Sequence, residues 1–257
     1  MNVSIKVLEE KIFHSNEIDD EMVELLKKDE RKGVQKLLKR YETMKQKETA
    51  LEHMHIKMTE YESALRKDGF LHIAGLDEVG RGPLAGPVVA AAVILPPDFK
   101  LLGLTDSKKL TKEKREMFFD VIKDKAIAYS IQMVHAAEID EINIYESTKL
   151  AMSRAVKELN CQPDHLLLDA IKLDLPIQQT SLIKGDQKSI TIAASSVLAK
   201  VTRDRYMDEI ALDFPGYGFS NHVGYGTKEH LDAISKFGIT KEHRKSFKPI
   251  AEVLQIS

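Results

Sequence analysis

The stretch GLDEVGRGPLAGPVVAAAVIL, residues 75–95, decides the fold of this chain. Phe70–Leu76 leads into it as an apolar run of strand length, and Val88–Leu95 is a second such run that ends at two prolines. Short apolar runs bounded by glycine and proline predict buried strands. Between them, the acidic pair Asp77 and Glu78 lies at the end of the first predicted strand, where a charge needs a partner or a metal ion.

Further along the chain, strand patterns alternate with helical ones. Three more strands are predicted, at residues 126–134, 165–168 and 180–183. Helical spacing of apolar residues predicts a helix capped by Thr111, helices over about 146–159 and 189–212, and another that begins near Thr227. Strands followed by alternating helices predict an α/β domain, with a mixed sheet flanked by helices, over residues 70–257.

The first 69 residues have a different pattern from the rest. They contain no proline and few glycines, and their apolar residues recur at helical spacing. Examples are Ile5, Leu8 and Ile12, and later Val34, Leu37, Leu38 and Tyr41. We therefore expect residues 1–69 to form a small helical N-terminal region.

A basic segment lies near the middle of this helical region. It contains Lys36, Lys39, Arg40, Lys45 and Lys47. We hypothesise that the region increases the hold on duplex nucleic acid or binds a protein partner. A solvated helix face is the ordinary alternative explanation of the same charges.

The composition restricts the classes of protein to be considered. Lys and Arg number 38 against 40 Asp and Glu, so binding to nucleic acid would have to come from a local basic patch. The single cysteine, Cys161, excludes a disulfide within the chain and a cysteine zinc cluster. No apolar run approaches the roughly 18 to 20 residues of a membrane span, and the first residues lack an apolar signal core. We expect a cytoplasmic protein with no membrane partner.

Four carboxylates are placed where they can meet. Besides Asp77 and Glu78, Asp169 ends the apolar run 165–168, and Asp186 lies in a loop before the long predicted helix. The ends of strands are where α/β sheets place their sites. Converging carboxylates repel one another unless a cation binds, and ligand sets of oxygen alone favour Mg²⁺ or Mn²⁺. On this pattern alone, an acidic pair in a solvated turn is the ordinary alternative.

Several ordered motifs give the chain a resemblance to a known family. The segment 75–95 resembles the signature of ribonuclease HII, and the resemblance covers about residues 72–250. It continues through Asp106–Leu110, Thr148–Met152, Leu168–Asp169, Lys184–Lys188, Ala193–Ser195, Val201–Arg205 and Gly224–His230. A lone Gly-Arg-Gly would be weak evidence, whereas motifs in this order and at these spacings are strong evidence.

The resemblance implies a ribonuclease H-like fold and a metal-dependent endonuclease. It assigns the catalytic and metal-binding carboxylates to Asp77, Glu78, Asp169 and Asp186, with Mn²⁺ or Mg²⁺ as the cofactor. It implies hydrolysis of the RNA strand of RNA–DNA hybrids and cleavage 5′ to single ribonucleotides embedded in duplex DNA. Two-metal-ion catalysis would leave 3′-hydroxyl and 5′-phosphate ends. Such an activity belongs to ribonucleotide removal in DNA repair and replication.

The resemblance also assigns contacts with the substrate, to Gly80, Arg81, Gly82, Ser107, Lys108 and Tyr225. The glycines let the backbone approach a ribose closely, and the 2′-hydroxyl is what distinguishes RNA from DNA. The tyrosine would pack on the sugar of the neighbouring deoxynucleotide, and the serine and lysine would contact phosphate. Each has an ordinary structural alternative, which is a tight turn, a core aromatic ring or a solvated lysine.

Two other functions are alternatives at the level of sequence. Ribonuclease HIII shares the acidic pair, but Arg81 between two glycines and the following Pro83–Pro87 favour ribonuclease HII. The alternative from another class is a non-enzymatic nucleic-acid binder with a structural metal ion. Structural metal sites are usually closed, whereas four carboxylates around a glycine loop leave room for a phosphate, which favours an enzyme. We expect a monomer, and we expect His222 and His230, which flank Tyr225, at the surface.

Overall fold

A mixed sheet organises the larger part of the computed structural model, which describes residues 3–14 and 18–255. Its strands are β1 (Ile73–Val79), β2 (Val88–Ile94), β3 (Ala128–Val134), β4 (His165–Asp169) and β5 (Gln178–Leu182). In space the order is β3-β2-β1-β4-β5. β1 is antiparallel to β2 and β2 to β3, whereas β1, β4 and β5 are parallel. The predicted mixed sheet is confirmed, and β1 lies at its centre.

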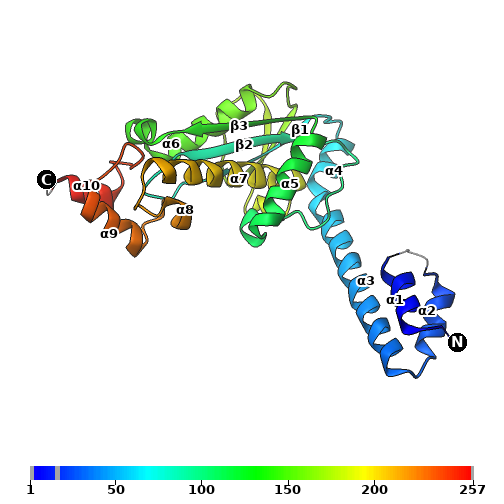
Figure 1. Cartoon of the computed structure of the whole chain (residues 1–257). Helices are drawn as coiled ribbons and strands as arrows, with labels where there is room; N and C mark the ends of the chain where they lie inside the picture. The colour runs from blue at the N-terminus through cyan, green and yellow to red at the C-terminus, as the bar shows by residue number, and fades with distance from the viewer. Residues whose placement is uncertain (1–2, 15–17, 256–257) are drawn as a thin grey trace. The chain divides into compact units, whose positions relative to one another are not determined.

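Helices cover both faces of this sheet (Figure 1). α6 (Ala136–Lys157) and α7 (Ile190–Asp213) pack on it, and α5 (Lys112–Lys125) adjoins α7. α8 (Phe219–His222), α9 (Lys228–Phe237) and α10 (Lys248–Gln255) form a separate small core with the end of α7. Two short 3₁₀ turns are η1 (Ser107–Lys109) and η2 (Gly185–Gln187). α6 packs in the main core with Ala74 and Leu76 of β1. α7 packs on the opposite face, where Ile192 meets Ile73 and Leu167. The central strands β1, β2 and β4 are therefore mostly buried on both sides.

α7 approaches β1 closely at Gly75. A Cβ atom on this glycine would overlap the backbone of Thr191 and Ile192. The hydroxyl of Ser195 donates to the carbonyl of Gly75 at 2.6 Å, which fixes the helix against the strand. Only a glycine permits this contact. The two residues that follow in β1, after Leu76, are the predicted acidic pair.

Side-chain caps start the helices where the sequence predicts. Thr111, Ser189 and Thr227 each accept a backbone N–H from the first turn of α5, α7 and α9. α6 begins earlier than predicted because it consists of two helical stretches joined at Asn143, whose φ is 66°. The side chain of Asn143 accepts the N–H groups of Tyr145 and Glu146 and so restarts the helix.

β1 begins three residues later than predicted and continues through the acidic pair. The carboxylate of Asp164 accepts the backbone N–H groups of Leu71 and His72, which holds them ahead of the strand. Asp77 and Glu78 are still paired with β2. The acidic pair therefore lies at the end of the strand, as predicted, but within the paired residues of β1 rather than after them.

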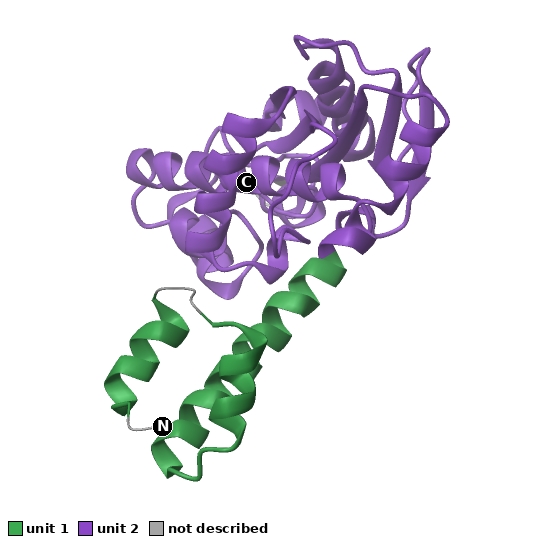
Figure 2. Cartoon of the chain, turned by 90° about the vertical axis from the view of Figure 1, so that its right-hand side faces the viewer, with its two compact units in different colours: residues 1–54 green, residues 55–257 purple. Residues whose placement is uncertain are grey.

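The chain divides into two compact units, residues 1–54 and 55–257 (Figure 2). α1 (Ile5–Phe13), α2 (Asp20–Lys27) and most of α3 (Lys32–Met58) belong to the first unit, and α4 (Glu60–Lys67) belongs to the second. The first unit is helical, as predicted, and its core consists of Leu8, Ile12, Leu26, Val34, Leu37 and Leu38. Ile5, predicted on the same apolar stripe, is 41% exposed.

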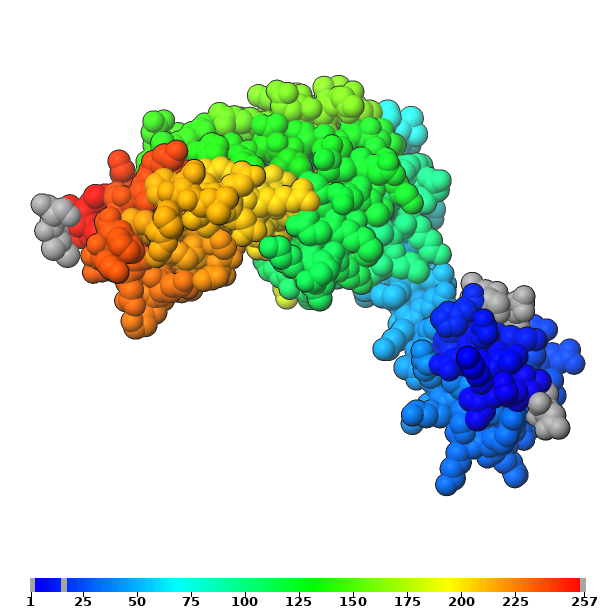
Figure 3. All heavy atoms as spheres, in the orientation of Figure 1, coloured from blue at the N-terminus to red at the C-terminus, as the bar shows by residue number. Residues whose placement is uncertain are grey.

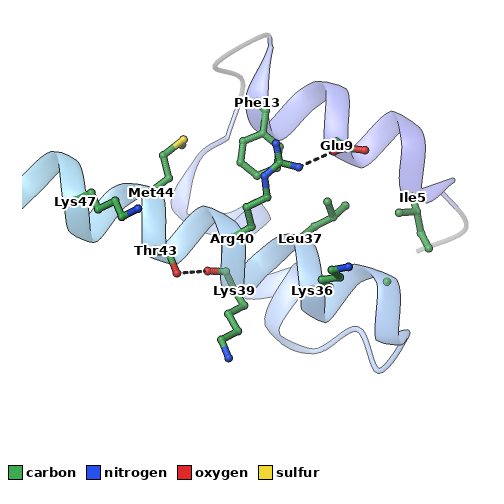
Figure 4. A pocket seen from close by; sticks show the side chains of 11 residues that line it. Ile5, Glu9, Phe13, Lys36, Leu37, Lys39, Arg40, Thr43, Met44 and Lys47 are labelled. Atoms are coloured by element: carbon green, nitrogen blue, oxygen red, sulfur yellow. Dashed lines mark hydrogen bonds and ion pairs between the residues drawn. The ribbon is translucent and has the colours of Figure 1, made fainter. Parts of the chain in front are cut away.

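An open groove of about 840 Å³ lies between α1 and α3 in the first unit (Figure 4). Arg40 covers the ring of Phe13 at 4.2 Å and pairs with Glu9 at 2.8 Å. Lys36 and Lys39 also line the groove, so most of the predicted basic segment gathers along it.

No helix within residues 3–14 and 18–255 has both the length and the apolar character needed to cross a membrane.

Candidate active site

Asp77 and Asp169 are neighbours on the parallel strands β1 and β4. Leu76 pairs with Leu168, so the next residue on each strand carries a carboxylate. Strand alternation directs both carboxylates to the face covered by α7. Asp77 is only 6% exposed, and burial, together with the charges of Glu78 and Asp169, raises its pKa well above the usual range. The pair needs compensating positive charge or protonation.

Hydroxyl groups from α7 and η1 face Asp77. The hydroxyl of Ser196 donates to its carboxylate, which opposes the rise in its pKa. Ser107 is buried, and its Oγ lies 3.0 Å from Oγ of Ser196. The backbone N–H of Glu78 donates to Oδ1 of Asp77 at 2.8 Å. The predicted substrate residue Ser107 is thus connected to the predicted carboxylate Asp77 through a residue of α7.

Contacts between α5 and α7 hold η1 at this position. The two helices adjoin at the surface, where α5 is green and α7 is gold (Figure 3). Arg115 at the start of α5 donates to the carbonyl of Ser107 at 3.2 Å and pairs with Asp204 of α7 at 3.7 Å. Arg205 of α7 pairs with Glu116 of α5. These bonds tie the Asp106–Leu110 segment to the helix that carries Ser196.

Glu78 joins the carboxylates from the adjacent position of β1. Burial raises its pKa, the nearby charge of Arg81 opposes this rise, and Asp169 adds to it. Nη1 of Arg81 lies 3.3 Å from Oε1. The other oxygen, Oε2, is buried and has no hydrogen-bond partner among the described residues. A buried oxygen without a donor indicates a place where a cation or a water molecule binds.

Asp186 approaches from η2. Burial, followed by the charges of Asp106 and Asp169, raises its pKa to about 6, and Lys108 opposes the rise. The backbone N–H of Gly185 donates to Oδ1 of Asp169 at 2.9 Å, so η2 is bonded directly to the end of β4. The structure therefore brings Asp186 and the predicted phosphate contact Lys108 to the same group of carboxylates.

The donor set of this acidic cluster, Asp77, Glu78, Asp169 and Asp186, fits a hard divalent cation. All its ligand atoms are oxygens, and raised pKa values in three of the four reflect charge that a cation would offset. Within residues 3–14 and 18–255, no three or more His, Cys, Asp or Glu side chains are arranged so that they could hold one metal ion together. Mg²⁺ commonly binds through one or two carboxylates and completes its shell with water and substrate phosphates.

The loop of Gly80, Arg81 and Gly82 rests on two buried arginines. Arg244 donates to the carbonyls of Gly80 at 2.6 Å, Arg81 at 3.0 Å and Gly86 at 3.0 Å. Gly80 has a φ of 91°, and a Cβ atom there would overlap the side chain of Arg203. Only glycine can adopt this positive φ and leave room for Arg203 without strain. The guanidinium of Arg244 therefore binds carbonyls of the loop from inside the protein, and that of Arg203 packs against Gly80.

The second arginine, Arg203 of α7, continues this support. It donates to the carbonyls of Pro87 at 2.9 Å, Ala85 at 3.1 Å and Val223 at 2.9 Å. Burial lowers the pKa of Arg203 to about 10 and that of Arg244 to about 9. Every hydrogen bond that they make with described residues ends on a backbone carbonyl, so Arg244 holds the loop of Gly80–Gly82 and Arg203 holds the backbone that follows it at Ala85 and Pro87.

Tyr225 lies beside this loop. A Cβ atom on Gly82 would be 3.6 Å from Cε1 of its ring, and the tyrosine is 46% exposed. Its carbonyl is 2.9 Å from Nδ1 of His230, and its N–H donates to the carbonyl of His222 at 2.9 Å. The two positions that the sequence predicts to recognise neighbouring sugars are therefore side by side.

The expectation that His222 and His230 lie at the surface is wrong. Both are buried, because their ring nitrogens find partners inside the protein. Nε2 of His222 lies 2.7 Å from the carbonyl of Tyr217, and Nε2 of His230 lies 3.1 Å from Nε2 of His243. Burial lowers the pKa of His230 and that of His243, which falls to about 4. His222 and His230 both bond to the backbone of Tyr225 and so hold this residue in place.

Some residues of the site carried no role in the sequence prediction. They are Asp106, Ser196, Arg203 and Arg244. Asp106 had a local signal, because an aspartate two residues before Lys108 accepts its N–H and starts η1. The arginines gave no signal, since a charged residue in a helical or loop pattern is usually solvated.

Comparison with known proteins gives the same family for both parts of the chain. The family described as ribonuclease HII matches residues 74–250, and that described as the ribonuclease HII N-terminal domain matches residues 4–66. Ribonuclease HII of Shouchella clausii is 59% identical over 250 residues, covering 97% of this chain and 94% of the relative. Ribonuclease HII of Halalkalibacterium halodurans is 60% identical over 235 residues, covering 91% and 89%.

Solved structures have the same fold. Ribonuclease H2 of Pyrococcus horikoshii matches with a TM-score of 0.61 at 24% identity, over 72% of this chain and 98% of that chain. RNase HII of Archaeoglobus fulgidus, in a complex with PCNA, matches with a TM-score of 0.59 at 25% identity, over 69% and 96%. Bst-RNase HIII in complex with Mn²⁺ matches with a TM-score of 0.58 at 17% identity, over 72% and 70%. The predicted ribonuclease H-like fold is confirmed.

Proposed function

The chain belongs to the ribonuclease HII family, and on that premise we propose that it cuts duplex DNA 5′ to single embedded ribonucleotides as well as the RNA strand of RNA–DNA hybrids. The products would be 3′-hydroxyl and 5′-phosphate ends. Such an endonuclease would serve ribonucleotide removal in DNA repair and replication. The relatives named ribonuclease HII make a non-enzymatic binder the weaker explanation.

The acidic cluster would hold the divalent cations. Two bound cations, Mn²⁺ or Mg²⁺, would stabilise the attacking and the leaving oxygen of the phosphodiester. Asp77 and Asp169 would be held by the sheet, while Gly185 orients Asp169 through its amide. Glu78 would offer a cation its oxygen Oε2, which has no hydrogen-bond partner among the described residues. Asp186 would approach the cations from the short turn η2, whereas the other three carboxylates lie on strands. The buried position of the cluster would exclude bulk water and strengthen each of these contacts.

The neighbouring loop would select the position of the cut. Because Arg244 binds the carbonyls of Gly80 and Arg81 from inside the protein, the loop of Gly80–Gly82 would present its N–H groups to a ribose and its phosphate. Tyr225 would pack on the sugar of the next deoxynucleotide, where an added 2′-hydroxyl would disturb the contact. Ser107 and Lys108 would position the backbone without reading bases. We expect little preference for base sequence.

The adjacency of Asp77 and Asp169, together with Gly82 beside Tyr225, carries this proposal. Asp169→Asn tests the chemistry, because it keeps the side-chain shape and removes one charge. We expect this variant to bind the ribonucleotide-containing duplex while cleavage with Mn²⁺ or Mg²⁺ falls by at least about 100-fold. Cleavage at the wild-type rate would contradict the proposed role of Asp169.

Ribonuclease HIII is the alternative within the superfamily. The solved HIII structure is only 17% identical to this chain, and that likeness concerns the fold alone. Substrates discriminate between the two activities. If the enzyme cuts long hybrids but leaves a single ribonucleotide in duplex DNA intact, the proposed HII specificity must be abandoned.

We propose that the helical region, residues 1–69, assists the catalytic domain, residues 70–257, by holding duplex or a protein partner. The basic groove of α3 supports this role. Replacing Lys36, Lys39 and Lys47 together by Glu should weaken duplex binding and reduce its salt dependence. An unchanged dependence of duplex affinity on salt concentration would exclude duplex binding by this groove.

We propose further that the enzyme acts as a monomer in the cytoplasm.

A further inference from the structure

Glu62 of α4 is a carboxylate buried completely within the second unit. One oxygen, Oε1, accepts the hydroxyl hydrogens of Ser189 at 2.6 Å and of Thr191 at 2.7 Å, and the N–H of Thr191 at 3.0 Å. The other oxygen is buried and has no partner among the described residues. Burying an ionisable group is unfavourable unless it is bonded in this way.

The three donors all belong to the start of α7. Ser189 is the N-cap of this helix, and Thr191 lies in its first turn. A carboxylate at a helix N-terminus also interacts favourably with the helix dipole. Glu62 therefore fixes the first turn of α7 from outside, in addition to the cap that Ser189 supplies from within.

A continuous series of hydrogen bonds leads from Glu62 to the acidic cluster. The hydroxyl of Ser189 donates to Glu62, the N–H of Ser189 donates to the carbonyl of Gly185 at 2.9 Å, and the N–H of Gly185 donates to Asp169 at 2.9 Å. The residue after Gly185 is Asp186. Two of the four carboxylates thus depend on a turn that is bonded to the start of α7.

Apolar contacts place α4 next to this turn. Leu65 of α4 packs against the small core cluster that contains Leu182 and Ile192. Ile192 also closes the space over Gly185, because a Cβ atom there would lie 2.6 Å from Cδ1 of the isoleucine. Arg66 donates to the carbonyl of Leu95 at 3.2 Å and joins α4 to the end of β2. α4 is therefore packed firmly enough to hold Glu62 in one position.

We propose that Glu62 is a positioning residue for the catalytic carboxylates Asp169 and Asp186. Glu62 fixes Ser189, and Ser189 in turn fixes the turn η2 through its bond to Gly185. The turn η2 contains the amide of Gly185, which orients Asp169, and the backbone that carries Asp186. Through this residue, the helix that precedes the catalytic sheet contributes to cation binding. The inference rests on the proposed function, because it concerns the residues that would hold the divalent cations.

The test is Mn²⁺ binding by the full chain, measured by calorimetric titration without nucleic acid and below the unfolding temperature. We expect Glu62→Ala to weaken Mn²⁺ binding by about tenfold, as the loss of outer-shell partners of metal ligands usually does. Glu62→Gln, which keeps one accepting oxygen, should lie between the two. Glu60→Gln alters an exposed residue of the same helix and should bind Mn²⁺ like the wild type.

A matched pair of variants compares the two hydroxyls that donate to Glu62. Ser189→Ala also removes the cap bond to Ile192, whereas Glu62→Ala and Glu62→Gln keep it, so the Glu62 variants separate positioning from simple capping. Ser189→Ala removes a bond to Glu62 at the residue that contacts Gly185, whereas Thr191→Ala removes a bond of similar length away from that route. We expect weaker Mn²⁺ binding and a higher Mn²⁺ requirement for cleavage in Ser189→Ala only, with KM for the duplex unchanged within about twofold. If Glu62→Ala does not fold, Glu62→Gln decides the question, because it also leaves the cap of Ser189 in place.

Two results would overturn the inference. One is wild-type Mn²⁺ affinity in folded Glu62→Ala or Ser189→Ala, and the other is an equal loss of affinity in Ser189→Ala and Thr191→Ala. Failure of the proposed function would be seen differently, since the wild-type chain itself would then neither bind Mn²⁺ nor cut the duplex.

Discussion

Asp186→Asn should stabilise the metal-free protein while it abolishes cleavage. Burial and two neighbouring carboxylates raise the pKa of Asp186 from the usual 3.8 to about 6. A carboxyl whose pKa is raised by folding contributes stability that is fully present below its unfolded pKa and is lost as the pH rises through its folded pKa. Asparagine does not titrate, so the variant escapes this loss.

The magnitude follows from the difference between the two pKa values. The wild type would lose at most about 3 kcal/mol of unfolding free energy when Asp186 ionises, and solvent screening reduces this loss to about 1 kcal/mol. For a chain of this size, such a change moves the unfolding temperature by about 2 to 4 °C. The variant should therefore unfold at nearly the same temperature as the wild type at a pH below 3.8 and about 2 to 4 °C higher at pH 8, both in EDTA.

Thermal unfolding followed by circular dichroism measures this difference. Asp174→Asn, at an exposed position with the same change of side chain, is the control and should show no such pH dependence. Added Mn²⁺ should stabilise the wild type more than Asp186→Asn, because binding to the folded state raises its stability. A gap in unfolding temperature that is independent of pH, or a less stable variant at pH 8, would refute this reasoning.

Three further predictions concern the loop beside the cluster. Arg244→Gln should lower the free energy of unfolding in urea by at least about 3 kcal/mol, since it leaves the buried carbonyls of Gly80 and Gly86 and the part-buried carbonyl of Arg81 without their donor, and an unchanged urea midpoint would contradict this. Gly80→Ala should lose at least about 1 kcal/mol in the same assay, because alanine is strained at a φ of 91°, and a stability equal to the wild type would disprove the strain. Tyr225→Ala should change the urea midpoint little, because the ring is half-exposed, yet reduce kcat/KM on a single embedded ribonucleotide by about tenfold relative to long hybrids. Equal losses on both substrates would remove Tyr225 from the recognition of the junction.

The sequence predicted those parts of the fold that depend on local patterns. The continuous apolar run at β2 and the caps at Thr111 and Thr227 place these elements almost where the structure has them. β1 was displaced because Asp164, almost a hundred residues away, binds the residues ahead of it. A bond across that separation leaves no mark in a short window of sequence.

In the candidate site, too, the sequence predicted what depends on local patterns and missed what depends on long-range contacts. The placement of Asp77 and Asp169 at corresponding positions of two apolar runs predicted that they meet, and the parallel register brings them together. Glu62 and Arg244 could not be predicted, because a charged residue in a helical or polar stretch is normally solvated, and only tertiary partners make its burial possible. The charges that hold the site in place were therefore those that sequence patterns assign to the surface.

Cleavage mapping on a DNA duplex with one embedded ribonucleotide tests the central claim most directly. The enzyme, supplied with Mn²⁺ or Mg²⁺, should make one cut on the 5′ side of the ribonucleotide and leave a 3′-hydroxyl on the upstream fragment and a 5′-phosphate on the downstream fragment. An intact duplex, under conditions in which a long RNA–DNA hybrid is degraded, would contradict the claim that the loop of Gly80–Gly82 and Tyr225 recognises a ribose followed by a deoxyribose.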